Sequence, residues 1–345
     1  MRRGVFRALA MAAGMSCFVL GQKTSTVPLA QKTPSGLPNI PRMILKEVDV
    51  IQSPLENSGF YGSPICDSDG NTYLRTDAFL AVDKNPIWKV SPKGRRLTIF
   101  ASPTEAEKEF RLGSFTVSGR GDFYAVTYDY GGETENYFLL RYGSDGEVSS
   151  KVNLELPQQL LLDELGVFAS GNILVSGHFS NKVPKAMQDQ PRVLVLQSDG
   201  SPAGEVHLRG EAAAPVDDTL PLGSVSMGDD ENAYLLRGPE VLVISPAGKL
   251  ERIIPVSSPS SGFQAESVQV SHGVLSVIFQ KVNSGKQRKV EVMFRTFDPV
   301  TGVVQAEYLP DAGISNYPLC FNPDEGYTFL GQKDGKTALV RAWVR

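Results

Sequence analysis

Short alternating strands separated by tight glycine turns make up nearly all of the chain after residue 42. The clearest stretch, residues 64–100, contains turns at Asp67–Gly70 and Pro92–Gly94 between runs of alternating apolar and polar residues. Turns of the Asp-Gly and Pro-x-Gly kind place glycine where the backbone needs a positive φ, and they join antiparallel strands. The stretch therefore predicts two linked hairpins, which make one four-stranded unit.

The same unit recurs along the whole chain. The glycines of the second turn follow one another at intervals of 52, 54, 48 and 54 residues. A period near fifty with two hairpins per unit is typical of propeller blades, in which each small sheet covers the next. We therefore predict an all-β chain, a six-bladed β-propeller with four-stranded antiparallel blades, with a β-sandwich as the alternative. Residues 154–165 form the one segment predicted as a short helix. The second-turn glycines are Gly94, Gly146, Gly200, Gly248 and Gly302.

The two ends of this repeat array are complementary. Residues 43–51 read as a strand without a preceding turn, and residues 337–344 read as a third strand without a fourth. An unpaired sheet edge is a template for aggregation, so pairing these two segments removes a liability. We therefore expect strand 43–51 to join the last blade and close the ring, which makes residues 42–345 a single domain.

The repeat resembles a known family. The pattern D-G-N-x-Y-L at Asp69–Leu74 and the pattern I-x-x-V-x-P-x-G at Ile87–Gly94 resemble the six-bladed propellers of the NHL and TolB-like superfamily. The resemblance covers residues 42–345, and the later copies depart from it. It implies the fold alone, because members of this superfamily bind ligands, scaffold partners or catalyse reactions.

The first residues have the composition of an export signal. Arg2 and Arg3 precede a largely apolar run, and small residues stand near Gly21, so we expect a signal peptide over residues 1–21 that is cleaved after Gly21. The alternatives are a retained anchor, a lipoprotein site at Cys17 and a twin-arginine signal. No later run is apolar enough to span a bilayer. Residues 22–41 read as a disordered tether, so we expect an exported protein, periplasmic or secreted.

Charge restricts the range of partners. When residues 1–21 are removed, the chain has 31 Lys and Arg residues and 38 Asp and Glu residues, which gives a net charge of −7. A negative surface repels phosphate backbones, so we do not expect a nucleic-acid partner. We expect a monomer that binds a protein, a peptide or a glycan.

The working face is predicted from loop lengths. Strand direction reverses at each turn, so the short glycine turns fall on one face and the longer connections on the other. Binding residues gather on loops held by a rigid scaffold, and we therefore expect a ligand- or protein-binding module that uses the long-loop face. Tyr128 and Tyr130 stand beside carboxylates and could contact a sugar or a peptide. The alternative is that this segment is only a solvated hairpin tip. The candidate residues are Tyr128, Asp129, Tyr130, Glu133, His178 and Phe179.

The alternative function is a hydrolase or lyase with carboxylates and tyrosines at the channel mouth, and the paired acids Asp163-Glu164 and Asp217-Asp218 are its candidates. We expect no metal, because His178, His207 and His272 fall on elements that do not converge. We expect no cofactor either, since no phosphate-binding or dinucleotide loop occurs in a strand–turn–helix setting.

Two cysteines remain after the signal is removed. Cys66 and Cys320 are predicted in the innermost strands of the first and last blades, which adjoin in a closed ring. Export permits a disulfide, but adjacent inner strands lie near the limit of its reach. We favour two buried thiols and keep the disulfide as the alternative.

Overall fold

The computed structural model divides the chain into residues 1–39 and 40–345. The described residues are 40–52, 59–60, 64–77, 86–101, 103–105, 108–129, 136–188, 190–208, 220–283, 289–314, 317–324, 326–334 and 336–344. The predicted signal peptide and most of the predicted tether therefore lie outside them. Within the described part, no helix has the length and apolar character needed to cross a bilayer.

The first half of the repeat array forms three sheets. The first contains β2 (Gly59–Phe60), β4 (Thr72–Asp77), β5 (Ile87–Val90) and β6 (Arg96–Phe100), with β3 (Ile65–Cys66) paired to β4. The second contains β7 (Thr104–Glu105), β8 (Lys108–Val117), β9 (Phe123–Asp129), β10 (Tyr137–Tyr142) and β11 (Val148–Leu154). The third contains β12 (Leu160–Val167), β13 (Ile173–Phe179), β14 (Arg192–Leu196) and β15 (Pro202–Glu205), with the helix α1 (Lys185–Gln188) between β13 and β14.

The second half forms two sheets. One contains β16 (Leu222–Met227), β17 (Ala233–Arg237), β18 (Glu240–Ile244) and β19 (Leu250–Pro255). The other has eight strands in the order β20 (Gln264–Ser271), β21 (Val274–Asn283), β22 (Lys289–Phe297), β23 (Val304–Pro310), β1 (Arg42–Gln52), β26 (Lys336–Val344), β25 (Gly326–Lys333) and β24 (Pro318–Asn322).

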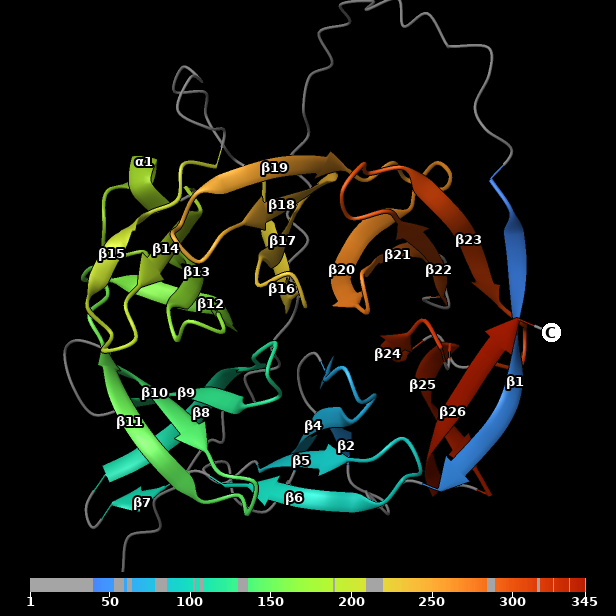
Figure 1. Cartoon of the computed structure of the whole chain (residues 1–345), viewed down its shortest axis with the longest axis horizontal. Coiled ribbons are helices and arrows are strands. Elements are labelled where there is room, and N and C mark those ends of the chain that lie inside the picture. The colour runs from blue at the N-terminus through green and yellow to red at the C-terminus, as the bar shows by residue number, and fades with distance from the viewer. Residues whose placement is uncertain are drawn as a thin grey trace, which may run out of the picture. The chain divides into compact units, whose positions relative to one another are not determined.

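These sheets have a propeller-like arrangement (Figure 1). The innermost strands β3, β8, β12, β16, β20 and β24 each contact the next, and β24 contacts β3. The prediction of an all-β, propeller-like chain of antiparallel sheets is thus confirmed. The prediction of six separate blades is not: hydrogen bonding gives four sheets of four or five strands and one of eight. The reason is that β1 pairs on both of its edges and fuses the last two four-stranded units.

The strand β1, near the start of the described chain, pairs with the last strand, β26, as expected. It runs antiparallel to β26 from the Leu45–Val344 pair to the Gln52–Ala338 pair. On its other edge it runs parallel to β23 from Arg42–Glu307 to Leu45–Pro310. Because Leu45 is fully buried, the pairing also adds an apolar side chain to the core.

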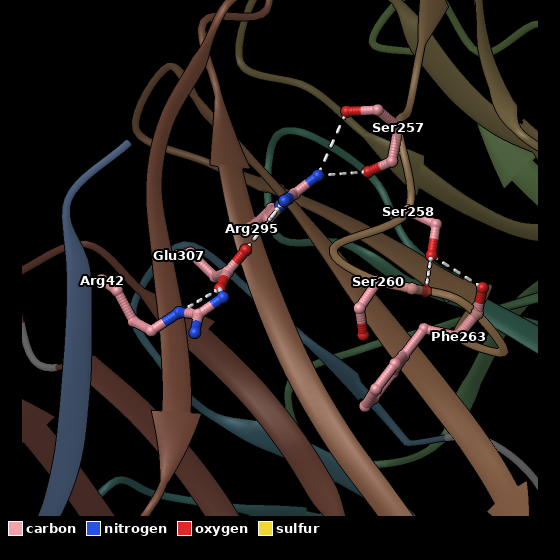
Figure 2. Close-up of polar contacts among 7 residues, drawn as sticks. All are labelled: Arg42, Ser257, Ser258, Ser260, Phe263, Arg295 and Glu307. Carbon is pink, nitrogen blue, oxygen red and sulfur yellow. Dashed lines mark hydrogen bonds and ion pairs between the residues drawn. The ribbon is translucent and has the colours of Figure 1, made fainter. Parts of the chain in front are cut away.

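Buried charges fix the start of β1 (Figure 2). The Arg42 Nε donates to Glu307 Oε1 over 2.6 Å, and Arg295 donates to Glu307 Oε2 from Nε at 3.0 Å and from Nη2 at 2.8 Å. The remaining nitrogen of Arg295 reaches the carbonyl of Ser257 at 2.6 Å, in the segment after β19. That segment is held by the Ser258 hydroxyl, which donates to the carbonyls of Ser260 and Phe263. One carboxylate therefore ties β1, β22 and β23 together, and Arg295 extends the link to the preceding sheet.

The repeat glycines have two structural roles. All five second-turn glycines adopt positive φ, from 71° to 91°. At Gly146 a Cβ atom would lie 2.3 Å from the Ile99 carbonyl oxygen, and at Gly200 it would lie 1.9 Å from that of Asn153. The turn of one sheet thus packs against the outer strand of the preceding sheet, where a side chain has no room. In the degenerate copies Glu231 and His272 take positive φ without being glycine.

The prediction of a helix over residues 154–165 is wrong. Leu160–Val167 is the strand β12, paired with β13 from Leu160–Phe179 to Val167–Ile173. Leu160 and Leu165 are both buried, so the leucine-rich run supplies the core between sheets rather than one helix face. Cross-strand pairing has overridden the local helical preference.

The preference for free thiols is also wrong. Cys66 in β3 and Cys320 in β24 are joined by a disulfide, with Cα atoms 5.7 Å apart. The Thr72 hydroxyl lies 3.1 Å from the Cys320 sulfur and must donate, because a disulfide sulfur carries no hydrogen. The two inner strands approach more closely than the sequence argument assumed, and the bond links the first sheet to the last.

Candidate functional site

The inner strands share an irregularity near the end that carries the longer connections. In each of five inner strands the pairing with the next strand shifts at one point, as in a β-bulge. Bulges bring consecutive side chains out of strict alternation and re-aim them, which makes this ring of positions a natural place for a site. The shifts fall at Leu112/Phe115, Leu162/Glu164, Leu222/Val225, Ala265/Ser267 and Pro318/Cys320.

In β12 the bulged residue is Asp163, and it pairs with a histidine. The His178 Nδ1 lies 2.7 Å from Asp163 Oδ2, with 47% and 45% of the two side chains exposed. Because Nδ1–H donates to the carboxylate, Nε2 is the ring nitrogen free to accept from a ligand. The Asp163 carbonyl is also held, since the Ser114 hydroxyl of β8 donates to it over 2.5 Å. The pair is therefore positioned from two neighbouring sheets.

Glu164, the next residue, has a different environment. Its side chain is half-buried, and burial, reinforced by the neighbouring Asp163 charge, raises the pKa of the Glu164 carboxyl to about 7. No hydrogen bond or ion pair reaches this carboxyl from the part of the chain that the structure describes. A carboxyl with this pKa is present in both protonation states near neutral pH, so it both donates and accepts hydrogen bonds.

Comparison of the repeats shows why Glu164 is unusual. Ser114, Glu164 and Ser224 each stand three residues before the end of their inner strand. The two serines bond to the following inner strand: Ser114 to the Asp163 carbonyl, and Ser224 to the Val268 amide over 2.8 Å. Glu164 replaces this structural serine with a longer, ionisable group.

A second polar group beside Glu164 lacks a partner. Ser176 is directly opposite Glu164 in the β12–β13 pairing, so the two side chains lie on the same face of the sheet. Ser176 is fully buried, and its hydroxyl has no hydrogen-bond partner among the residues that the structure describes. A buried hydroxyl without a partner is rare in folded proteins and needs an explanation. The site thus combines Asp163, Glu164, Ser176 and His178.

The structure separates the residues predicted for the site. His178 and Phe179 end β13, where His178 meets Asp163 and Phe179 lies under the Arg192 guanidinium at 5.7 Å. Tyr128 lies in β9, half-buried, and packs on Tyr137 with ring centroids 6.1 Å apart. It packs against the core cluster that includes Leu165 of the next sheet. Asp129 ends β9, and its side chain lies outside the described residues, as do Tyr130 and Glu133 entirely.

The other predicted groups have local partners. His272 lies 3.9 Å from Asp324, and His207 follows β15 on the surface. The Asp67 carboxylate accepts hydrogen bonds from Asn71 and Tyr73 and pairs with Lys89 at 3.1 Å. The polar side chains of the D-G-N-x-Y-L signature thus find their hydrogen-bond partners within the turn and its own sheet. Across the described ranges, no group of three or more metal-ligating residues occurs. Asp217 and Asp218 lie outside the described residues.

Sequence reasoning missed how the site is assembled. It named Asp163-Glu164 and His178 separately, and it missed Ser176, because a serine in an apolar strand carries no signal by itself. The only clue was the position of Glu164, where two other repeats have serine. The pairing of β12 with β13 brings the four residues together.

Comparisons with known proteins show similarity at the level of fold. No protein-family model and no curated protein matches the chain. Solved structures do. A luciferin-regenerating enzyme shares 10% identity and a TM-score of 0.49, over 86% of this chain and 95% of its own. A gluconolactonase from Xanthomonas campestris shares 14% identity and a TM-score of 0.46, over 86% and 98%. A protein of unknown function from Bacteroides caccae shares 14% and 0.45, over 72% and 80%. The fold class therefore rests on the strand pairing, and the activities of these proteins do not transfer at such identities.

Proposed function

We propose that the chain is an exported propeller that binds a small polyhydroxylated ligand, such as a glycan, at the inner-strand end formed by Asp163, Glu164, Ser176 and His178. The observation that carries the proposal is the convergence of these four residues from β12 and β13, with a half-buried Glu164 carboxyl that has no hydrogen-bond partner among the residues that the structure describes. Carboxylates accept from sugar hydroxyls, while a protonated Glu164 donates to them.

The test is a glycan panel screened by thermal shift, because a ligand that binds only the folded state raises its apparent stability. We expect at least one glycan to raise the melting temperature of the wild type. Glu164→Gln and Asp163→Asn should each reduce this shift. Glu147→Gln, an exposed acid at a short turn, is the matched control and should retain it. Equal shifts in all four proteins would contradict the proposed site.

A second candidate function is cleavage of the same class of ligand, by a hydrolase or a lyase. The observation that favours it is the Glu164 carboxyl, whose pKa of about 7 suits a general acid or base, close to the Asp163–His178 pair. Nitrophenyl glycosides provide the assay. Turnover that Glu164→Gln abolishes while ligand binding persists supports the enzyme, and binding without turnover by the wild type supports the binding module.

The proposal also includes the number of blades and the export of the chain. If the eight-stranded sheet is counted as two blades bridged by β1, the repeat has six blades, as in the NHL and TolB-like superfamily. The closed cycle of contacts among β3, β8, β12, β16, β20 and β24 supports this count. The Cys66–Cys320 disulfide supports export to an oxidising compartment as a monomer whose ring closes on itself. N-terminal sequencing of the secreted protein tests cleavage after Gly21.

A further inference from the structure

A cavity lies on the outer strands of the third sheet, apart from the inner-strand residues described above. It has a volume of about 480 Å³, within the range of small-molecule sites. Its walls come from β14, from β15 and from the segment that leaves β11. The lining residues are Glu155, Leu156, Pro157, Leu194, Leu196, Pro202, Gly204 and Glu205.

The cavity is preformed by backbone contacts. The Glu155 amide donates to the Gly200 carbonyl over 3.0 Å, and the Leu160 amide donates to that of Pro157 over 3.1 Å, so the segment at 155–157 is held at both ends. β15 is only four residues long and exposed throughout. In the β14–β15 pairing Leu194 lies opposite Glu205 and Leu196 lies opposite Pro202, so these four side chains share one face of the sheet. The cavity lies against that face.

The lining determines which chemistry suits the cavity. Its side chains are mostly aliphatic, with two carboxylates. Glu205 is already paired with Arg192 at 2.5 Å, and Arg192 is further held over Phe179. The exposed Glu155 side chain forms no hydrogen bond or ion pair with the residues that the structure describes. The uncompensated charge of the cavity is thus a single negative one.

We propose that this cavity binds a small amphipathic cation, with its apolar body on Leu194 and Leu196 and its ammonium group beside Glu155. Apolar area removed from water supplies the affinity, and the single carboxylate supplies the preference for a cation over an anion of the same shape. Glu205 cannot do this, since its charge is compensated by Arg192.

The test uses 1-naphthylmethylamine as the probe and 1-naphthylacetate as its anionic counterpart, titrated by fluorescence into the mature chain. We expect the amine to bind at least tenfold more tightly than the acetate. Pro202→Phe should weaken amine binding at least tenfold by filling the cavity, and Glu155→Gln should weaken it threefold to tenfold. Pro202 lines the cavity and is exposed on the edge strand β15, so the larger side chain leaves the core in place.

The control is Gly313→Phe, which adds the same side chain at a glycine with free space around its Cβ position and no positive φ, and it should bind as the wild type does. Glu164→Gln should also bind normally, which separates this cavity from the site of the proposed function. If Pro202→Phe unfolds, Pro202→Leu and the methyl NMR shifts of Leu194 and Leu196 during titration replace it. Equal affinity for the two probes, or an unaffected Pro202 variant, overturns the proposal.

Discussion

Glu307 connects two arginines of very different burial, which allows a sharp prediction. Its side chain is 3% exposed, that of Arg295 is 9% exposed, and that of Arg42 is 62% exposed. All three belong to one hydrogen-bonded cluster (Figure 2), so distance alone does not separate the two ion pairs. The two ion pairs differ in burial. Water screens the charge of an exposed side chain, whereas a buried charge that loses its partner has no solvent to compensate it.

Glu307→Gln keeps the shape of the side chain and removes its charge. The buried Arg295 then lacks a counter-charge, which typically costs about 3–5 kcal/mol. Arg42→Ala removes a partner that already faces water, and exposed pairs contribute about 0–1 kcal/mol. We therefore expect Glu307→Gln to lower the free energy of unfolding by about 3–5 kcal/mol and Arg42→Ala to lower it by less than 1 kcal/mol.

Urea unfolding followed by tryptophan fluorescence measures both changes. An unfolding entropy of about 2.1 cal/mol/K per residue, over roughly 300 residues, converts 3–5 kcal/mol into a fall in melting temperature of about 5–8 °C. The control is Arg141→Ala, which removes an exposed pair with Asp122 at 3.2 Å and should match Arg42→Ala. If Glu307→Gln and Arg42→Ala cost the same, burial does not set the strength of this cluster and the reasoning fails.

Three further predictions concern the ring, the site and a turn. Replacing Cys66 and Cys320 by serine should cost about 2–5 kcal/mol, since the bond spans 254 residues of sequence, and dithiothreitol should remove the difference between wild type and variant. Because the pKa of Glu164 rises from 4.5 to about 7 on folding, the folded chain binds more protons in that window. Stability in urea should therefore fall by up to about 3 kcal/mol as pH rises through it, and Glu164→Gln should flatten that slope. Glu231 has a φ of 64°, so Glu231→Gly should raise the free energy of unfolding measured in urea by about 0.5–1 kcal/mol, whereas Glu147→Gly, without positive φ, should lower it.

Local chemistry explains which parts of the fold were predictable. Each turn glycine reports a backbone conformation of its own few residues, and the period of these turns defines the repeat. The pairing of residues 43–51 with 337–344 was also predictable, because an incomplete unit at each end leaves a single way to satisfy both edges. In contrast, residues 154–165 were misassigned, since a leucine-rich run fits a helix or a buried strand equally well.

The sequence by itself determined the all-β repeat, its turns and the closing strand, because these depend on φ preferences and on alternation within a few residues. Only the tertiary structure decided that Cys66 bonds to Cys320, that β1 pairs on both edges, and that Asp163 meets His178 beside an ionisable Glu164. These features depend on distances and burial between strands, and short-range patterns contain no measure of either.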